Sequence, residues 1–306
     1  MNKKILITGV AGFIGSKLAK KLINEGYFVT GIDNLSTGFK KNIPKRVKFI
    51  NGNFSDKKLL KKINLKQYEI IFHIGGQSSG AISFDDPIKD LTDNVISTIN
   101  ILDLIKNSKT KFIYASSVAV YGNISQKKLN IDDQCQPSSF YGVGKITSEM
   151  YMKVYSEVYG NKCIAFRIFN TYGPDQDLKN LRQGMISIYF AQAMKNLKII
   201  VKGNKNRFRD YIHINDVIDV FFKSIYYSPK KFEVFNICTG KKTKVFEILN
   251  NIKKFFNKKV SIKFEKVTLG DQFGVVGNNY ITRKKLRWKP KIPLKKGLLD
   301  FFNYYK

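Results

Sequence analysis

The chain opens on a short apolar run, a turn rich in glycine, and a stretch in which apolar residues recur at helical spacing. The run is "KILITGV", the turn holds Gly9, Gly12 and Gly15, and the helical stretch is "SKLAKKLINEG". A second apolar run, "FVTGID", follows directly. This change from continuous to helical periodicity and back predicts a β-α-β unit, because each pattern matches the burial of one kind of element.

The same alternation continues through the first half of the chain. Four more apolar runs read "VKFING", "EIIFHIGG", "KFIYASS" and "KCIAFRIFN", and helical stretches such as "DLTDNVISTINILDLIKN" and "SEMYMKVYSEVYG" lie between them. Short, almost wholly apolar strands between helices are typical of a parallel sheet covered on both faces. We therefore expect an α/β fold with a doubly wound parallel sheet of the Rossmann type.

After about Thr171 this rhythm stops. A loop "YGPDQD", a helix, a short strand "KIIVKG" and a lysine-rich tail follow. This pattern predicts a smaller C-terminal lobe packed against the carboxyl ends of the strands. We assign residues 1–170 to the sheet domain, with residues 210–240 returning to it, and residues 171–209 and 241–306 to the lobe, which we expect to bind substrate.

Cysteine and histidine usage excludes several classes of protein. The 306 residues are 43% hydrophobic, enough for a full core, and hold three widely spaced cysteines and two histidines, His73 and His213. A disulfide framework and a metal site are therefore not expected, and we interpret both histidines as structural. No apolar segment is long enough to span a bilayer, so we expect a cytoplasmic protein in a reducing compartment.

The formal net charge of +31 is carried almost entirely by lysine. The lysines are spread through runs such as "DKKLLKKINLK" and "RKKLRWKPKIPLKK", mixed with apolar residues, and arginine is scarce. Arginine is the residue best suited to bidentate phosphate contacts. We interpret the charge as solvated helix faces, so nucleic acid is not the expected partner, while an anionic substrate is compatible with it.

The glycine turn and the residue that ends the second strand predict a dinucleotide site. Glycines between a strand and a helix let backbone amides approach a pyrophosphate, and the helix N-terminus favours the negative charge. Asp33 ends "FVTGID", where a carboxylate can bind the ribose diol of adenosine. The same carboxylate would repel a 2′-phosphate, so we expect NAD as the cofactor in preference to NADP.

A tyrosine and a lysine four residues apart occur in "SSFYGVGKITSEM", where a turn-like segment gives way to a helical one. At this spacing Tyr141 and Lys145 share one helix face. An ammonium beside a phenol favours the phenolate and lowers its pKa from the usual value of about 10. We therefore expect Tyr141 to act as a base near neutral pH.

Several ordered blocks resemble the extended short-chain dehydrogenase/reductase family, the nucleotide-sugar epimerases and dehydratases. The glycine spacing G-x-x-G-x-x-G and the Y-x-x-x-K pair match this family, and further blocks follow in its order across nearly the whole chain. They read "DNLSTG", "FHIGGQ", "SSVAVYG", "RIFNTYGP", "RFRDYIHINDV" and "FNICTG". The resemblance implies an NAD-dependent nucleotide-sugar epimerase.

The resemblance also assigns roles to individual residues. Ser117 would hydrogen-bond the reacting sugar oxygen and relay the proton to Tyr141, and Lys145 would hold the nicotinamide ribose and stabilise the phenolate. Together these three residues form the expected catalytic set. The residues expected to bind the cofactor are Gly9, Gly12, Phe13, Ile14, Gly15, Asp33, Asn34, Asn53, Phe54, Gly75, Gln77, Asn94, Tyr141 and Lys145. Asn53 stands where the family usually has an aspartate near the adenine.

For the substrate, the resemblance implies contacts from Ser117, Asn170, Arg209, Asp271 and Val275. Asn170 and Arg209 would hold the pyrophosphate of a nucleotide-sugar. The family has a second phosphate-binding arginine in an R-x-G-D block, but "TLGD" places Thr268 there, so we expect Arg207 or Lys266 to substitute. Val275, four residues after Asp271, takes a position that faces the sugar, and its small size predicts room for an N-acetyl group.

The expected reaction is C4 epimerisation of a UDP-hexose or UDP-N-acetylhexosamine through a 4-keto intermediate. Two related reactions are alternatives. A 4,6-dehydratase is disfavoured because Val118 and Ala119 stand where that enzyme needs an acid and a base, whereas a one-way 4-ketoreductase uses the same three catalytic residues. A protein of another class, binding NAD or RNA on this fold without catalysis, would explain the charge but not the set of Ser117, Tyr141 and Lys145.

We also expect a homodimer. Members of the extended family usually pair through two helices that here correspond to residues 93–107 and 142–160, forming a four-helix bundle between subunits. The stretch "NVISTINILDLI" has apolar residues around much of its helix, more than one stripe facing a sheet requires.

Overall fold

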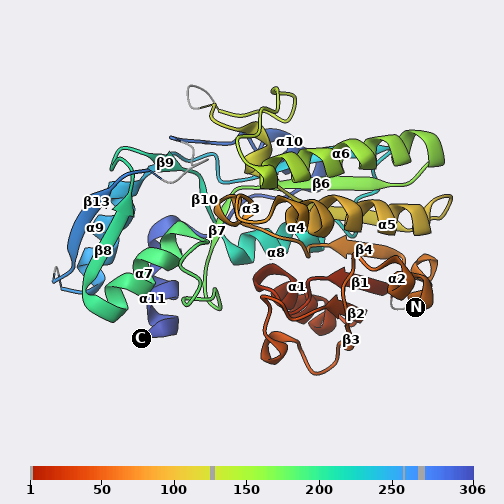
Figure 1. The fold of residues 1–306 in the computed structure, drawn as a ribbon, viewed down its shortest axis with the longest axis horizontal. Coiled ribbons are helices and arrows are strands. Elements are labelled where there is room, and N and C mark those ends of the chain that lie inside the picture. The colour runs from red at the N-terminus through yellow and green to blue at the C-terminus, as the bar shows by residue number, and fades with distance from the viewer. Residues whose placement is uncertain (1–2, 125–127, 258, 268–272) are drawn as a thin grey trace.

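The computed structural model describes residues 3–124, 128–257, 259–267 and 273–306 (Figure 1). Its centre is a seven-stranded sheet in the order β11-β6-β5-β4-β1-β2-β3, and every pair of neighbouring strands is parallel. The strands are β1 (Lys4–Thr8), β2 (Phe28–Asp33), β3 (Lys48–Asn51), β4 (Ile70–His73), β5 (Lys111–Ser117), β6 (Cys163–Ile168) and β11 (Phe232–Ile237). The strand order reverses between β1 and β4, and in open α/β sheets ligands bind outside the carboxyl ends of the strands at such a point.

Alternate residues of the strands enter two separate cores. In β1, Ile5 and Ile7 face one apolar cluster and Leu6 faces the other, and all three are fully buried. In β5, Ile113 lies in the first cluster and Tyr114 in the second. Burial of both faces explains the nearly continuous apolar runs in the sequence, and it confirms the predicted doubly wound parallel sheet.

Helices cover each face of the sheet. One face packs against α1 (Phe13–Asn24), α8 (Ile214–Lys223) and α10 (Tyr280–Leu286). The other packs against α2 (Lys57–Ile63), α5 (Ser97–Ile105) and α6 (Phe140–Tyr159), and α5 lies beside α6 (Figure 1). Two short helices, α3 (Gly80–Ser83) and α4 (Pro87–Leu91), precede a π-helical turn at Thr92–Ile96, which leads into α5.

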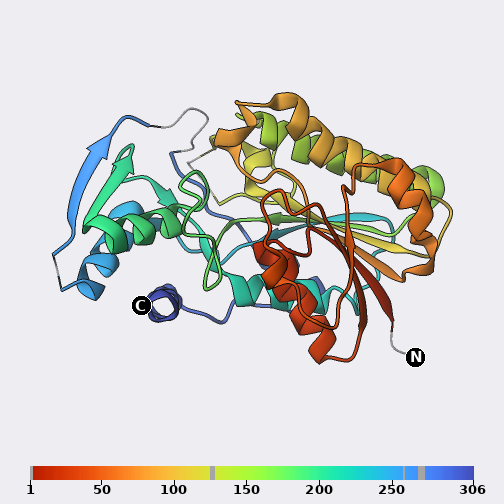
Figure 2. The same ribbon diagram turned by 60° about the horizontal axis from the view of Figure 1, so that its bottom comes forward.

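A smaller lobe lies beside the sheet domain, as Figure 2 shows. It contains α7 (Met185–Asn196), α9 (Val245–Phe255) and α11 (Leu294–Tyr305), and a parallel pair of strands, β8 (Lys198–Lys202) and β13 (Ser261–Glu265). Its core is separate and includes Ile186, Phe190, Ile248 and Phe301. Two short pairs, β7 (Asn170–Tyr172) with β10 (Tyr211–His213) and β9 (Phe208–Arg209) with β12 (Thr243–Lys244), link the lobe to the sheet.

The expected boundary of the lobe differs from the structure near the C-terminus. The predicted lobe takes in all of residues 241–306, but α10 packs against β11, and Leu286 and Trp288 lie in a core of the sheet domain. The Trp288 indole also donates a hydrogen bond of 3.0 Å to the carbonyl of Asp216 in α8. The chain therefore returns to the sheet once more before α11, because the apolar face of α10 completes the cover over β11.

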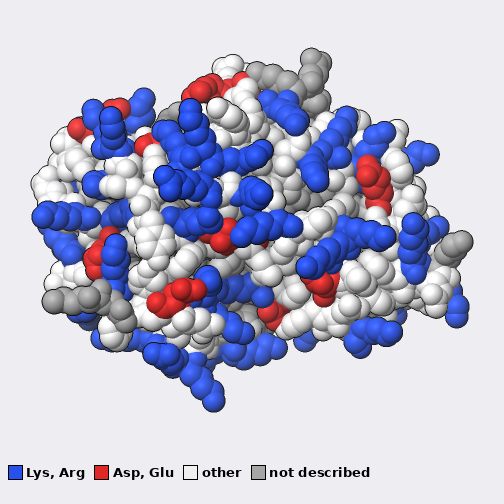
Figure 3. All heavy atoms as spheres, turned by 180° about the vertical axis from the view of Figure 1, so that it is seen from behind, with Lys and Arg blue, Asp and Glu red and all other residues white. Residues whose placement is uncertain are grey.

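Basic side chains are spread over the face of the molecule that Figure 3 shows, rather than gathered in one place on it. Figure 3 shows lysine and arginine across the whole visible face, with acidic residues among them. Among the described residues, several lysines form ion pairs, such as Lys57 with Asp103 and Lys285 with Glu233. Within the same residues, no helix has the length and apolar character needed to cross a bilayer.

Candidate active site

The glycine turn forms a cradle at the N-terminus of α1. Gly9 has φ +71°, and a Cβ added there would lie 2.6 Å from Gly75 Cα, so only glycine fits. A Cβ on Gly15 would collide with the Gly9 carbonyl, which shows how closely α1 approaches β1. Around Gly12, by contrast, an added Cβ would meet only the Gly9 oxygen, at 3.3 Å.

The first turn of α1 has donors to offer to an anion. Its N-cap is Gly12, no side chain among the described residues caps it, and its first turn carries no acidic residue. Phe13 and Ile14, in this turn, are half-buried and pack against the core below. Backbone amides that no side chain caps, beside a glycine that faces space, suit a pyrophosphate. This observation shows that the residues present fit a dinucleotide.

Asp33 lies at the carboxyl end of β2, beside the glycine turn. Its side chain is buried, Oδ2 accepts a hydrogen bond of 2.9 Å from Ala11 N, and Oδ1 accepts one of 2.8 Å from Leu35 N. These two hydrogen bonds therefore fix the position of the Asp33 carboxylate beside the glycine turn. Its neighbour Asn34 accepts a hydrogen bond from Ser36 N at 3.1 Å, which forms a turn that leads the chain away from the strand.

The residues after β3 and β4 form the other wall of the cradle. The Phe54 ring is buried against Gly75, since a Cβ on Gly75 would lie 2.5 Å from it. Asn53 orders the preceding turn by accepting a hydrogen bond from Ser55 N at 2.9 Å. Gln77 donates to the Ser79 carbonyl at 2.8 Å. Asn94, in the π-helical turn, is fully buried, and its Oδ1 atom has no hydrogen-bond partner among the described residues.

The three expected catalytic residues meet at the carboxyl end of β5. Ser117 is the last residue of β5 and its Oγ accepts a hydrogen bond from Ala119 N at 3.2 Å. Ser139 caps α6 by accepting a hydrogen bond from Gly142 N at 3.2 Å, so Tyr141 lies in the first turn of that helix. The Ser117 hydroxyl lies close enough to the Tyr141 phenol to lower its pKa.

Lys145 lies one helical turn after Tyr141 and is 3% exposed. Its Nζ donates a hydrogen bond of 2.9 Å to the Ala115 carbonyl in β5. The same atom lies 5.6 Å from the centre of the Tyr141 ring and 4.6 Å from that of Tyr114. The lysine is therefore held between the sheet and the tyrosine, within the field of two aromatic rings.

The acidities differ from the sequence-based expectation. Burial raises the pKa of Tyr141 to about 12; the hydrogen bond with Ser117 opposes this rise and the charge of Asp90 adds to it. Burial lowers the pKa of Lys145 to about 8, while Asp90 and Glu149 raise it. The expected fall in the pKa of Tyr141 is thus wrong for the protein chain alone, because desolvation of the phenolate is the largest effect on it.

Sequence reasoning missed Asp90, which the structure places beside this group. Asp90 is 1% exposed in α4, and its Oδ1 accepts hydrogen bonds from Gln77 Nε2 at 2.8 Å and Asn94 Nδ2 at 3.2 Å. The available signal was the spacing of four between Asp90 and Asn94, which puts both on one helix face. The π-helical turn that carries Asn94 gave no such signal.

The expected substrate residues lie on the links between the sheet and the lobe. Asn170 begins β7 and is half-buried, and its Nδ2 donates to the Asp210 carbonyl at 3.4 Å. Arg209 is 4% exposed and donates to the Phe208 carbonyl at 2.8 Å. Burial lowers the pKa of Arg209 to about 10, Tyr211 opposes that fall, and the charge of Arg207 adds to it. Arg207 and Lys266 are the two residues expected to replace the missing phosphate-binding arginine. Arg207 is buried, and its charge acts on Arg209, so the two arginines are close; Lys266 is exposed after β13.

Two of the expected substrate positions, Asp271 and Val275, are not among the residues that the structure places at the site. Asp271, like Thr268, lies outside the described residues. Val275 is fully buried and packs in an apolar cluster with Val118, Tyr121 and Phe169. The expectation that Val275 faces the sugar is therefore not supported by the structure, because its side chain fills a core beneath the loop that follows Ser117.

Both histidines are structural in the described chain. His73 Nδ1 lies 2.7 Å from Thr8 Oγ1 and its Nε2 lies 3.1 Å from Ser97 Oγ. Burial lowers the pKa of His73 to about 3, and the charge of Lys145 adds to the fall. His213 accepts a hydrogen bond from Asn215 N at 3.3 Å and so caps α8. No cluster of metal-binding side chains occurs among the residues that the structure describes.

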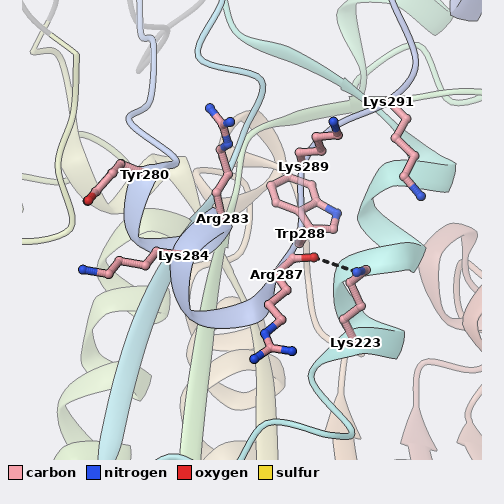
Figure 4. Close-up of a pocket in the computed structure, with 8 residues that line it drawn as sticks. All are labelled: Lys223, Tyr280, Arg283, Lys284, Arg287, Trp288, Lys289 and Lys291. Atoms are coloured by element: carbon pink, nitrogen blue, oxygen red, sulfur yellow. Dashed lines mark hydrogen bonds between the residues drawn. The ribbon is translucent and has the colours of Figure 1, made fainter.

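A cavity of about 510 Å³ lies elsewhere, between α8, α10 and the segment after α10 (Figure 4). Its lining is Lys223, Tyr280, Arg283, Lys284, Arg287, Trp288, Lys289 and Lys291. Lys223 donates a hydrogen bond of 2.7 Å to the Arg287 carbonyl, and the other basic side chains fan outward in Figure 4. This hollow holds none of the expected site residues, so we interpret it as a solvated basic surface.

A dinucleotide cradle beside a serine, tyrosine and lysine at the carboxyl end of a parallel sheet defines an NAD-dependent enzyme of the short-chain dehydrogenase/reductase class. The chain belongs to the NAD dependent epimerase/dehydratase family, whose model matches residues 5–238. NAD is therefore its cofactor, as Asp33 predicted.

Three similar proteins illustrate the relationship. A Methanocaldococcus jannaschii protein with the provisional name UDP-glucose 4-epimerase is 36% identical, over 99% of this chain and 98% of the relative. The UDP-glucose 4-epimerase of Thermotoga maritima, solved with UDP-glucose, is 30% identical with a TM-score of 0.94, over 99% of this chain and 98% of that one. A UDP-N-acetylglucosamine 4-epimerase of Methanobrevibacter ruminantium, solved with UDP-N-acetylmuramic acid, is 25% identical with a TM-score of 0.92, with the same coverage.

Proposed function

We propose that this enzyme inverts C4 of a UDP-linked hexose through a 4-keto intermediate, with Ser117, Tyr141 and Lys145 as its catalytic residues. The observation that carries the proposal is the meeting of these three side chains at the end of β5, next to the glycine cradle. The UDP-sugar 4-epimerases among the similar proteins support the choice of substrate class and of reaction.

The protein's own residues would move one proton in each half-reaction. The Tyr141 phenolate takes the proton of the 4-hydroxyl group and later returns it to the 4-keto oxygen, and Ser117 shares the hydrogen bond to that oxygen. Lys145 holds a positive charge beside the phenolate. Held by the glycine cradle and Lys145, a bound NAD+ would supply the acceptor for the C4 hydride. Proton and hydride are both restored, so the cofactor is unchanged after one turnover.

The two alternative reactions differ in what the chain must supply. A dehydratase needs a general acid and base directly after Ser117, and the structure places Val118 and Ala119 there, at the start of a short 3₁₀ turn. A 4-ketoreductase consumes reduced cofactor and must release it. Buried Asp33 and the close-packed glycine cradle favour a cofactor that stays bound.

The test is a product assay on purified enzyme with UDP-galactose and, separately, with UDP-N-acetylgalactosamine. We expect the matching C4 epimer to form without added cofactor, and acid extraction to release NAD. Loss of water from the substrate would indicate a dehydratase. A requirement for added reduced cofactor, consumed in proportion to product, would indicate a reductase and contradict the proposal.

We also propose that two copies pair through α6 and the segment of α4 to α5. Several apolar side chains there are exposed; the set is Ile88, Leu91, Ile96, Val143, Met150, Val154 and Val158, of which Ile88 is 71% and Val158 65% exposed. These residues lie on α4, the π-helical turn and α6, and so many exposed apolar side chains on neighbouring elements are unusual for a monomer. Sedimentation should give a dimer at micromolar concentration, and Val154→Glu with Val158→Glu should give a monomer. A monomeric wild type would contradict this assembly.

We infer that the protein works in the cytoplasm. The support is the state of its cysteines: Cys135, Cys163 and Cys238 are all free, and the last two are buried. Fractionation of the source cells, with an antibody to this chain, tests the inference.

A further inference from the structure

Asp90 is a buried carboxylate that the reaction proposed above does not use. Asp86 caps α4 by accepting a hydrogen bond from Lys89 N at 2.8 Å, and this fixes the short helix that carries Asp90. One turn later the chain forms the π-helical turn that contains Asn94. Such turns occur frequently at functional sites. Both side chains face α6, the helix of Tyr141 and Lys145.

The carboxylate orients two amides that we expect to contact the cofactor. Asp90 Oδ1 accepts hydrogen bonds from Gln77 Nε2 and Asn94 Nδ2. With its amide nitrogen also donating to the Gln77 carbonyl at 3.1 Å, Asn94 turns its Oδ1 toward Gly76, where a Cβ would lie 2.5 Å from it. That oxygen is the buried acceptor without a partner in the described chain. Asp90 therefore fixes an open acceptor at the cradle wall.

The second oxygen of Asp90 reaches α6 through a gap left by glycine. A Cβ added at Gly144 would lie 3.0 Å from Asp90 Oδ2 and 3.4 Å from Asn94 Cβ. Gly144 separates Tyr141 from Lys145 along the helix. Glycine costs helix stability relative to alanine, so its presence here needs a reason, and the close approach of the carboxylate supplies one.

The charges around this group are few and can be named. Burial raises the pKa of the Asp90 carboxyl, Lys145, Asn94 and Gln77 oppose the rise, and Asp93 adds to it. The other carboxylate near Lys145 is Glu149, but it is already paired with Arg167 at 2.7 Å. Among the described residues, Asp90 accepts only from the two amides and forms no ion pair with a cation at the surface.

We propose that Asp90 is a positioning residue of the epimerase: it holds the amides of Gln77 and Asn94 toward the cofactor and supplies the negative charge opposite Lys145 and Tyr141. The inference rests on the proposed roles of Tyr141 and Lys145. It assigns to Asp90 no contact with the sugar. Its consequence is that the pH range of the enzyme depends on a carboxylate outside the Ser-Tyr-Lys set.

The charge is tested with Asp90→Asn, which keeps the shape and the hydrogen bonds to both amides. Asp90 raises the pKa values of both Tyr141 and Lys145. Without its charge, the phenolate forms at lower pH and the ammonium is lost at lower pH, so both limbs of the pH profile of kcat should move to lower pH. Asp93→Asn, which removes a neighbouring carboxylate paired with Lys89, is the matched control and should leave the profile unchanged.

A measurement without substrate separates this inference from the proposed function. The near-ultraviolet absorbance of phenolate is titrated in the wild type and in Tyr141→Phe, and the difference isolates Tyr141. The same difference in the Asp90→Asn background should titrate at lower pH. If the enzyme did not epimerise but this shift occurred, the proposed function would fail and the inference would stand. An unshifted titration would overturn the inference.

The positioning of the amides is tested with Asp90→Ala. Purified Asp90→Ala should carry less NAD per subunit than Asp90→Asn and the wild type, as measured by acid extraction. Equal NAD content in all three would contradict the positioning role. Should either variant fail to fold, Gly144→Ala keeps the carboxylate but displaces it, and it gains helix propensity. It should shift the pH profile in the same direction, and an unchanged profile would count against the proposal.

Discussion

Two buried lysines, Lys111 in β5 and Lys145 in α6, lie near opposite ends of β5, and they are alike in burial but not in their contacts. Lys111 begins the strand, is 8% exposed, and donates three hydrogen bonds of 2.7 to 2.8 Å to the carbonyls of Ser224, Ile225 and Tyr227. Among the described residues, Lys145 of α6 donates one, to the Ala115 carbonyl in β5. Burial lowers both pKa values to about 8.

The difference lies in how many donors each ammonium has used. An ammonium has three donors, and those of Lys111 are all occupied by carbonyls at the end of α8. Lys145 uses one of its three donors within the described chain, in the bond to Ala115. Its charge lies beside two aromatic rings and two carboxylates. A saturated lysine holds two elements together, whereas an unsaturated one has capacity for a ligand. Burial or a lowered pKa alone would not have distinguished the two.

Replacing Lys145 should have the largest effect. Lys145→Met removes the charge beside the phenolate and the expected contact to the cofactor, so kcat should fall by a factor of about a hundred or more. The matched Lys111→Met should keep kcat within a few-fold of wild type. Steady-state rates at saturating substrate measure both. Similar losses in the two variants would break the comparison.

The effect on stability should be the reverse, with the larger loss expected when Lys111 is replaced. Lys111→Met removes the donor to the carbonyls of Ile225 and Tyr227, just after α8, while the Ser224 carbonyl keeps its hydrogen bond from Tyr227 N. This should lower the free energy of unfolding by about 3 kcal/mol. The native pKa near 8 lies below the usual value of 10.5. Between these values unfolding takes up a proton, so this lysine's contribution to stability should grow with rising pH across that window. Denaturant titrations of both proteins at several pH values would show the gap widening, and a gap that narrows would contradict the assignment.

Activity should report the titration of Lys145 in the same pH range. Its pKa is about 8, so the ammonium beside Tyr141 is lost as the pH rises above that value. We expect kcat to fall on the alkaline side by up to about tenfold per pH unit. Lys111→Met should show the same alkaline limb. If the alkaline limb disappeared in Lys111→Met, the titration would belong to Lys111, and its assignment to Lys145 would be wrong.

The smallest effect on activity is expected from a substitution of Val275. Val275→Tyr should overfill the apolar cluster beneath the loop after Ser117 and lower the free energy of unfolding by about 1–3 kcal/mol. The ratio of rates on UDP-N-acetylgalactosamine and UDP-galactose should stay unchanged, because the side chain is fully buried. Selective loss of the N-acetylated substrate would restore the sequence-based hypothesis that this position faces the sugar.

The sequence predicted the sheet domain better than the lobe for a physical reason. The fold of the first half follows from periodicity, and the positions of Gly9, Asp33, Tyr141 and Lys145 follow from short local motifs at the ends of strands. Asp90 and Lys111 owe their environment to contacts across the fold, between α4 and α6 and between β5 and α8. No local pattern records such contacts. The sequence also predicted the wrong direction for the shift in the pKa of Tyr141. Burial causes that shift, and burial is a property of the tertiary fold.

The most direct test of the account is the turnover of Tyr141→Phe. This change removes only the phenolic oxygen, which lies beside Ser117. The half-buried ring itself is kept, so the packing of α6 stays intact. We predict a folded protein with NAD still bound and a kcat reduced by about a hundredfold or more, since positioned proton transfer contributes at least that much. Retention of more than about a tenth of the wild-type rate would contradict the assignment of Tyr141 as the acid and base.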